Sequence, residues 1–111
     1  MSEEFRTRYM RILVMFDLPV ETAVQRRNYR LFRKNLIKDG YLMLQKSVYV
    51  KLAVNEHALE RELQRLRKKK PPEGLVQVLK ITEKQFATME YITGKRSDFD
   101  EIDTTEEFVI I

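Results

Sequence analysis

The sequence predicts an α+β domain of the ferredoxin-like type, in which the order βαββαβ builds a four-stranded antiparallel sheet with both helices on one face. Three observations lead to this prediction. The five consecutive apolar residues Ile12 to Phe16 are typical of a central strand buried on both sides. Two segments with helical apolar spacing alternate with three further strand-like runs in the required order. The 111 residues suffice for one modest core.

The first helix is expected from Thr22 to about Lys38. Thr22 and Gln25 have the spacing of a capping box, and Gly40 is a left-handed stop. The apolar side should cover the sheet and carries Val24, Tyr29, Leu31, Phe32 and Leu36. An opposite arc of about 140° is cationic, with Arg26, Arg27, Arg30, Arg33, Lys34 and Lys38. No acidic residue lies in this helix to neutralise them.

Two antiparallel strands are expected next, over residues 41–44 and 47–52. In the second of them Val48, Val50 and Leu52 share one face, and Ser47, Tyr49 and Lys51 share the other. That second face is interpreted either as a contact for a ligand or second subunit, or as the polar face of an ordinary strand.

The second helix is expected to begin at Asn55 and to end before Pro71. Its buried stripe should consist of Leu59, Leu63 and Leu66. A fourth strand is expected over residues 75–81, followed by a capping box, a short helix through about Tyr91, and a stop at Gly94. This order completes the predicted fold within residues 1–96.

Residues 97–111 are expected to form an acidic linker followed by a strand. The linker holds six acidic residues and no basic one, and the chain ends with the apolar residues Phe108, Val109, Ile110 and Ile111. Four apolar side chains are poorly suited to water, so they should pair with a sheet edge, which we expect to belong to another subunit.

Charge is distributed unevenly along the chain. From Arg6 to Lys51 there are eleven basic and three acidic residues, a net charge of +8, and the sequence pI is about 9.4. This imbalance favours a polyanionic partner such as nucleic acid. The alternative is a solvated surface made basic for solubility.

Composition also excludes several kinds of chemistry. The chain has no cysteine and one histidine, His57. Disulfides, zinc-finger ligation and a histidine-based triad are therefore excluded. No apolar run approaches the roughly 20 residues that cross a bilayer, and the first residues lack the order of a signal peptide. We therefore expect a cytoplasmic protein that makes no contact with membranes.

Four motifs resemble a known family. They are Met15 to Pro19, Lys38 to Tyr41 after a basic helix, Gln45 to Tyr49, and Thr82 to Phe86. Together they resemble the CRISPR-associated protein 2 family, small ferredoxin-like endoribonucleases that form the second subunit of the spacer-acquisition machinery. The fourth motif is most similar to members from type II systems, whose effector is a single large RNA-guided nuclease.

The resemblance implies a homodimer in which two sheets pack face to face and the C-terminal strand crosses to the neighbour. The family's shared aspartate corresponds to Asp17, so two such residues would flank the dimer axis and hold Mg²⁺. The family also implies a scaffold that bridges two dimers of the CRISPR integrase subunit while double-stranded DNA lies across its basic surface.

Two functions are therefore predicted. The favoured one is a scaffold that binds the backbone of double-stranded DNA, or of RNA, without reading bases. We expect the contacts to come from Arg11, Arg26, Arg27, Arg30, Arg33, Lys34, Lys46 and Lys51. The alternative is a Mg²⁺-dependent endoribonuclease or endonuclease with Asp17 as the catalytic and metal-binding residue.

Each of these predictions has a simpler alternative. Asp17 would serve only to cap the turn that precedes Pro19. The domain would be a ferredoxin-like regulatory or RNA-binding module outside CRISPR biology, although it lacks the aromatic-rich strand motif of an RNA-recognition domain.

Overall fold

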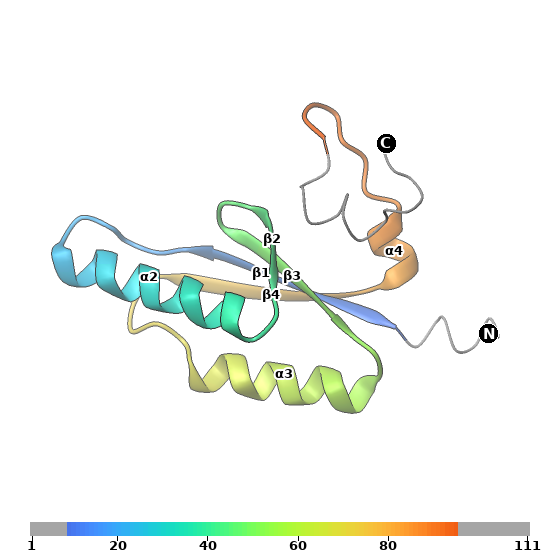
Figure 1. Ribbon diagram of the computed structural model, residues 1–111, viewed down its shortest axis with the longest axis horizontal. Coiled ribbons are helices and arrows are strands. Elements are labelled where there is room, and N and C mark those ends of the chain that lie inside the picture. Colours follow the sequence, from blue (N-terminus) through green and yellow to red (C-terminus); the bar gives the residue numbers. More distant parts are fainter. Residues whose placement is uncertain (1–8, 96–111) are drawn as a thin grey trace.

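The computed structural model describes residues 9–95 and confirms the predicted fold class (Figure 1). The elements are β1 (Met10–Asp17), α2 (Ala23–Lys38), β2 (Leu42–Gln45), β3 (Val48–Ala53), α3 (Glu56–Lys68), β4 (Leu75–Thr82) and α4 (Glu83–Ala87). The strands form one antiparallel sheet in the order β2-β3-β1-β4, the ferredoxin-like arrangement. The predicted terminal strand at residues 108–111 lies outside the described residues. Over residues 9–95 no helix is long and apolar enough to cross a membrane.

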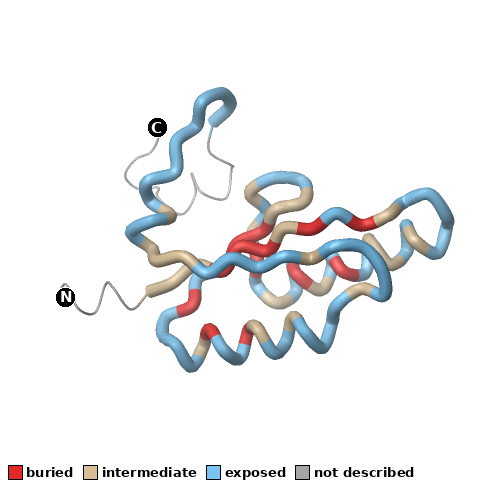
Figure 2. The backbone as a smooth tube through the Cα atoms, turned by 180° about the vertical axis from the view of Figure 1, so that it is seen from behind, coloured by how far each residue is buried: buried red, intermediate tan, exposed pale blue. Residues whose placement is uncertain are grey.

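The central strand β1 supplies the core. Ile12 and Val14 are completely buried and Phe16 is 6% exposed, all on the side of the sheet that α2 and α3 cover. Phe16 contacts the rings of Phe32 and Tyr49 with centroids 5.1 and 5.8 Å apart. In Figure 2 the buried residues gather in the middle of the sheet and on the helices packed against it. The sequence prediction of a buried central strand is confirmed.

Helix α2 begins as predicted, but fewer of its apolar side chains are buried than predicted. Thr22 and Gln25 form both bonds of the capping box. Phe32 and Leu36 are buried, but Val24 and Leu31 are 64% and 55% exposed, so their assignment to the buried side was wrong. They lie about 80° and 100° around the helix from Phe32, at the margin of the buried arc.

The prediction that Tyr49 lies on a polar face of β3 is wrong. Tyr49 is opposite Val14 in the register of β1 and β3, so it points to the helix side and is fully buried. Its hydroxyl has no hydrogen-bond partner among the described residues. Neither interpretation of that face, as a contact surface or as an ordinary polar face, applies to this residue.

Helix α3 is fixed to the sheet by an ion pair as well as by leucines. Leu59 is buried, while Leu63 and Leu66 are half-buried against the core. The 7% exposed Glu62 was not predicted to be buried. Its carboxylate accepts bonds from Lys51 Nζ at 2.7 Å and Arg65 Nη1 at 3.0 Å.

Lys51 of this ion pair also contacts the end of α2. Lys51 Nζ also donates to the backbone oxygen of Asp39 at 2.6 Å, and the Tyr41 hydroxyl donates to Glu62 at 3.4 Å. Burial, and then the negative charge of Glu62, raise the pKa of Tyr41 well above its ordinary value. Asp39, Tyr41, Lys51, Glu62 and Arg65 are called the Glu62 network below.

Helix α4 is shorter than predicted. It ends at Ala87, where the Thr88 amide and hydroxyl both bond back to Gln85. Met89 and Tyr91 are 42% and 43% exposed, so no buried stripe extends the helix to Tyr91. Gly94 has φ +86° but follows the helix by several residues, so its predicted role as the stop was wrong.

The Glu62 network predicts a difference between two ion pairs on α3. We expect Lys51→Ala to lower the free energy of unfolding by roughly 2 kcal/mol, because it removes a partner of a buried carboxylate. Arg67→Ala removes a pair with Glu60 in which both side chains are more than half exposed, and should cost less than about 0.5 kcal/mol. Urea denaturation of both variants measures the difference. Equal losses would show that the network contributes no special stability.

Candidate functional site

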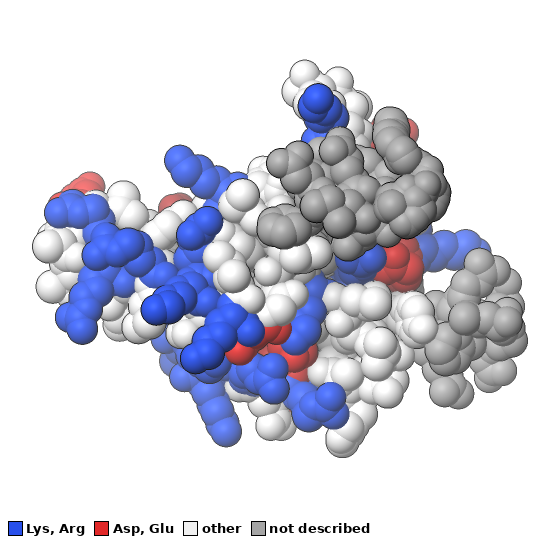
Figure 3. All heavy atoms as spheres, viewed as in Figure 1, with Lys and Arg blue, Asp and Glu red and all other residues white. Residues whose placement is uncertain are grey.

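A dense basic surface lies on α2. Its five members are exposed and form no hydrogen bond or ion pair with another residue of the described part of the chain: Arg27, Arg30, Arg33, Lys34 and Lys38. They are called the α2 cation face. Figure 3 shows blue atoms gathered over α2. Helix α2 contains no acidic residue that could neutralise these charges. The cations therefore repel one another and attract anions.

Three of the residues predicted to contact nucleic acid form hydrogen bonds or ion pairs within the protein instead. The Arg11 guanidinium pairs with both carboxylate oxygens of Glu83, at 2.6 and 3.0 Å, and lies 4.5 Å from the centre of the Phe86 ring. Arg26 donates to the backbone oxygens of the turn before α2 at 3.2 and 3.0 Å. Lys51 belongs to the Glu62 network. These three side chains hold the fold together.

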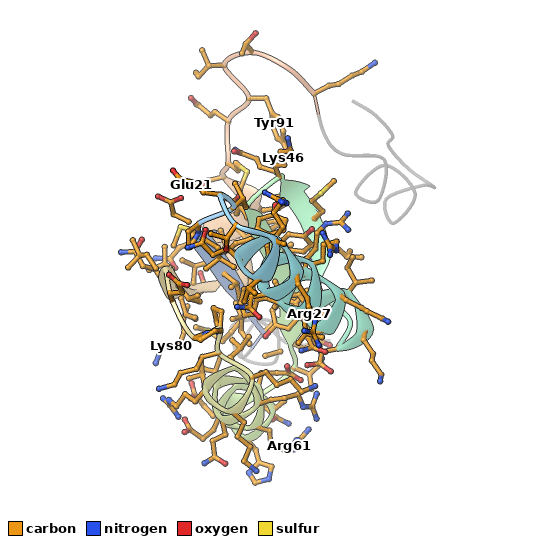
Figure 4. The ribbon with its side chains drawn as sticks, turned by 90° about the vertical axis from the view of Figure 1, so that its left-hand side faces the viewer. Glu21, Arg27, Lys46, Arg61, Lys80 and Tyr91 are labelled. Carbon is orange, nitrogen blue, oxygen red and sulfur yellow. The ribbon has the colours of Figure 1, made fainter. Side chains whose placement is uncertain are left out.

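The remaining predicted contact, Lys46, is exposed in the turn between β2 and β3, away from α2. The structure therefore brings together most of the predicted helix cations but not Arg11, Lys46 or Lys51. Helix α3 adds exposed cations, among them Arg61, which Figure 4 shows on the side of α3 away from the sheet.

Asp17 lies at the exposed end of β1. Its carboxylate accepts no hydrogen bond from residues 9–95, so the structure gives no support to a turn-capping role. By strand alternation it shares a face with Leu13 and Met15, opposite the face that the helices cover. Within the described chain no group of three or more His, Cys, Asp or Glu residues is placed to hold a metal.

The sheet face that carries Asp17 is apolar and uncovered by α2 and α3. The registers of β1 with β3 and β4 place Leu52, Leu75 and Leu79 on it, and these side chains are 37%, 54% and 50% exposed. This surface is called the open sheet face. Clusters of exposed apolar side chains are a common feature of surfaces that contact other macromolecules.

Gly74 packs closely against the backbone of Asp17 and the side chain of Leu18, a contact that was not predicted from the sequence. Its φ is +100°, and a Cβ atom there would lie 2.6 Å from Leu18 Cδ2 and 2.9 Å from the backbone oxygen of Asp17. The first residue of β4, Leu75, pairs with Asp17 directly. A glycine immediately before a predicted strand was the available signal, since such positions often need a left-handed backbone.

These features define a class of protein: a small ferredoxin-like domain with one cationic helix face and one apolar open sheet face. Residues 10–89 match the family model described as CRISPR associated protein Cas2, and the chain belongs to this family. The predicted family is thereby confirmed. The type II assignment stays a prediction.

Relatives and a solved structure agree with the family. A CRISPR-associated endoribonuclease Cas2 of Treponema denticola is 50% identical over 102 residues, 92% of this chain and 100% of that protein. One of Ligilactobacillus salivarius is 47% identical over 87 residues, 78% of this chain and 86% of that protein. A solved chain described as "Crystal structure of cas2" matches with a TM-score of 0.56 at 19% identity, covers 81% of this chain and 92% of its own, and shows the shared fold.

Gly74 gives a test of how the Asp17 end of the sheet is held. Gly74→Ala should lower the free energy of unfolding by roughly 2–4 kcal/mol, because it adds overpacking against Leu18 to an unfavourable φ. Gly94→Ala is the matched control: its φ is +86° with no atom within 4 Å, so about 1 kcal/mol is expected. Denaturation curves compare the two. Similar losses would show that close approach to Asp17 is not the constraint.

Proposed function

We propose that this protein is the scaffold subunit of CRISPR spacer acquisition, a homodimer that binds the backbone of double-stranded DNA and bridges dimers of the integrase subunit. The α2 cation face is the observation that carries the proposal. Membership of the Cas2 family supports a role in a CRISPR system. Such a role requires the protein to work in the cytoplasm, beside the DNA.

The α2 cation face suits phosphate binding without base reading. Arginine presents a planar fork that matches phosphate oxygens, and Arg27, Arg30 and Arg33 are all exposed on one helix. Because they have no internal counter-ions among the described residues, binding does not require existing ion pairs to break. Backbone contacts of this kind accept any sequence, as an adaptor for new spacers requires.

The open sheet face supports the dimer. Two copies that stack their sheets would remove Leu52, Leu75 and Leu79 from water. Asp17 lies on that same face at the end of β1, so two Asp17 carboxylates could approach each other in such a dimer. The dimer is part of the proposal, as is the crossing of residues 108–111 to the neighbour.

A second candidate function is a Mg²⁺-dependent endoribonuclease, as the relatives are named endoribonucleases. The exposed carboxylate of Asp17, which has no partner among residues 9–95, favours it. One chain offers too few oxygen ligands there within its described part, but two Asp17 residues with water and substrate phosphate fit the ligands that Mg²⁺ prefers. Bound Mg²⁺ would polarise the phosphoryl oxygen of the substrate. Asp17 would hold the metal, and the α2 cation face would orient the backbone.

Salt dependence tests the scaffold. Affinity for a random-sequence DNA duplex should weaken with salt, and the log-log slope should become shallower by about 0.9 for each phosphate that a variant no longer neutralises. Arg27→Ala with Arg30→Ala should therefore reduce the slope by about two units. Lys84→Ala with Lys95→Ala, two exposed cations outside α2, remove the same charge and should leave the slope nearly unchanged. Fluorescence anisotropy measures both, and equal slopes would exclude the α2 cation face as the contact.

Asp17→Asn separates the two functions, because it removes the charge and keeps the shape. We expect Mg²⁺-dependent cleavage of RNA to be abolished, while duplex affinity and spacer integration with the purified integrase subunit persist. Cleavage that continues undiminished would remove Asp17 from the nuclease hypothesis. Failure of integration with the dimer intact would contradict a scaffold that works without Asp17.

A further inference from the structure

The turn between β2 and β3 lies beside the end of β1 that carries Asp17. The Phe16 amide donates to the backbone oxygen of Ser47 at 3.1 Å, which extends the antiparallel pairing of β1 with β3. Asp17 follows Phe16, and Lys46 precedes Ser47, so each comes one residue beyond this hydrogen bond. The fold therefore brings Lys46 and Asp17 to the same end of the sheet.

Lys46 and Asp17 also lie on the same side of the molecule. Strand alternation places Asp17 on the open sheet face, which α2 and α3 leave uncovered. Figure 4 shows Lys46 at the top of the view, on the side of the sheet away from α3, whereas Arg61 of α3 is at the bottom. A ligand that approaches Asp17 from the open sheet face therefore meets the turn that carries Lys46.

Neither side chain is used within the described chain. Lys46 is exposed and forms no hydrogen bond or ion pair with another of residues 9–95. Asp17 is exposed too, and no cation in the same range lies within ion-pair distance of its carboxylate. A solvated lysine on a turn is the simpler explanation. An unpaired cation beside an unpaired carboxylate, at the end of a buried strand, is instead an arrangement that suits ligand binding.

Other described cations do not supply positive charge at this end of the open sheet face. The registers of the described strands place one basic residue on that face, Arg11, and it pairs with both carboxylate oxygens of Glu83 at the other end of β1. The α2 cation face belongs to a helix on the opposite side of the sheet. Lys46 is therefore the described cation that is available to an anion at Asp17.

A phosphodiester at Asp17 needs positive charge near its non-bridging oxygens, because the carboxylate repels it. Mg²⁺ supplies part of this charge when it is bound. In hydrolysis a water oxygen bonds to phosphorus, the bond to the leaving oxygen breaks, and a proton passes from the water to the leaving oxygen. Negative charge is spread over the phosphoryl oxygens in the transition state, where a nearby ammonium group stabilises it. Lysine suits this role as a point charge on a flexible stem.

We propose that Lys46 binds a non-bridging oxygen of the phosphodiester held at Asp17, and thus adds a substrate-binding cation to the candidate nuclease site. This inference rests on the proposed endoribonuclease function and deepens it. It also gives a reason for the position of Lys46 away from α2: the α2 cation face binds the backbone of the duplex, and Lys46 binds the phosphate that is cleaved. In each copy of the proposed dimer, Lys46 lies beside its own Asp17.

Single-turnover cleavage of a single-stranded RNA with Mg²⁺ tests the proposal. Lys46→Gln should lower the rate at saturating protein about tenfold to hundredfold, and Lys46→Arg should retain most of it, because the charge is kept. Lys80→Gln is the matched control: Lys80 is exposed, but its register partner is Ile12, so it lies on the helix side of the same sheet. Its rate should stay within about twofold of the unmodified protein. An unchanged saturating rate for Lys46→Gln overturns the proposal.

Amine acetylation read by mass spectrometry tests the contact without any cleavage. The Asp17→Asn protein is treated with and without a saturating amount of the same RNA. Bound RNA should slow the acetylation of Lys46 at least about fivefold and leave that of Lys80 nearly unchanged, since a lysine in contact with phosphate is shielded from the reagent. Acetylation of Lys46 at equal rates with and without RNA, or equal slowing at Lys46 and Lys80, overturns the proposal.

Asp17→Asn in the same cleavage assay distinguishes failure of this inference from failure of the proposed function. Cleavage lost in Asp17→Asn but kept in Lys46→Gln overturns the role of Lys46 and leaves the nuclease site at Asp17 in place. Cleavage that continues in Asp17→Asn refutes that site and this inference with it. Spacer integration and duplex affinity measure the scaffold independently, and Lys46→Gln should leave both unchanged. A shallower salt slope for duplex DNA, with cleavage unchanged, would overturn the proposal and return Lys46 to the scaffold surface.

Discussion

The structure depends on one constraint, that β1 is apolar on both faces and hydrogen-bonded on both edges. Ile12 and Val14 require cover from α2 and α3, and Leu13 and Met15 present a second surface that neither helix covers. A strand of this kind is suited to the centre of a sheet and not to its edge. The uncovered surface and the exposed Asp17 at its end therefore follow from the same five residues that build the core.

The Glu62 network decides where α3 lies. A carboxylate that is 7% exposed must keep its cations, so α3 is held near β3 and the end of α2. Leu63 and Leu66 then remain half-buried, and the space beside β4 stays open. An interaction that stabilises one side of the helix layer in this way leaves the other side available for binding.

Much of the fold could be predicted from local signals. The buried central strand, the capping boxes at Thr22 and Thr82, and the basic arc of α2 depend on neighbours along the chain, and the structure confirms them. Tyr49 and Glu62 could not be placed in this way, since their burial depends on cross-strand register and on Lys51. The same holds for Arg11 and Gly74, whose roles depend on Glu83 and Asp17 many residues away.

The α2 cation face also has a consequence for the free protein. Like charges three and four residues apart, such as Arg30 with Arg33 and Lys34, oppose helix formation by about 0.2–0.5 kcal/mol per pair. The helix is stabilised instead by its cap and by Phe32 and Leu36. Any polyanion that neutralises this surface removes the repulsion as it binds, so occupancy and folding are thermodynamically linked. Helix α2 is therefore less stable in the free protein than it would be in a complex with such a polyanion.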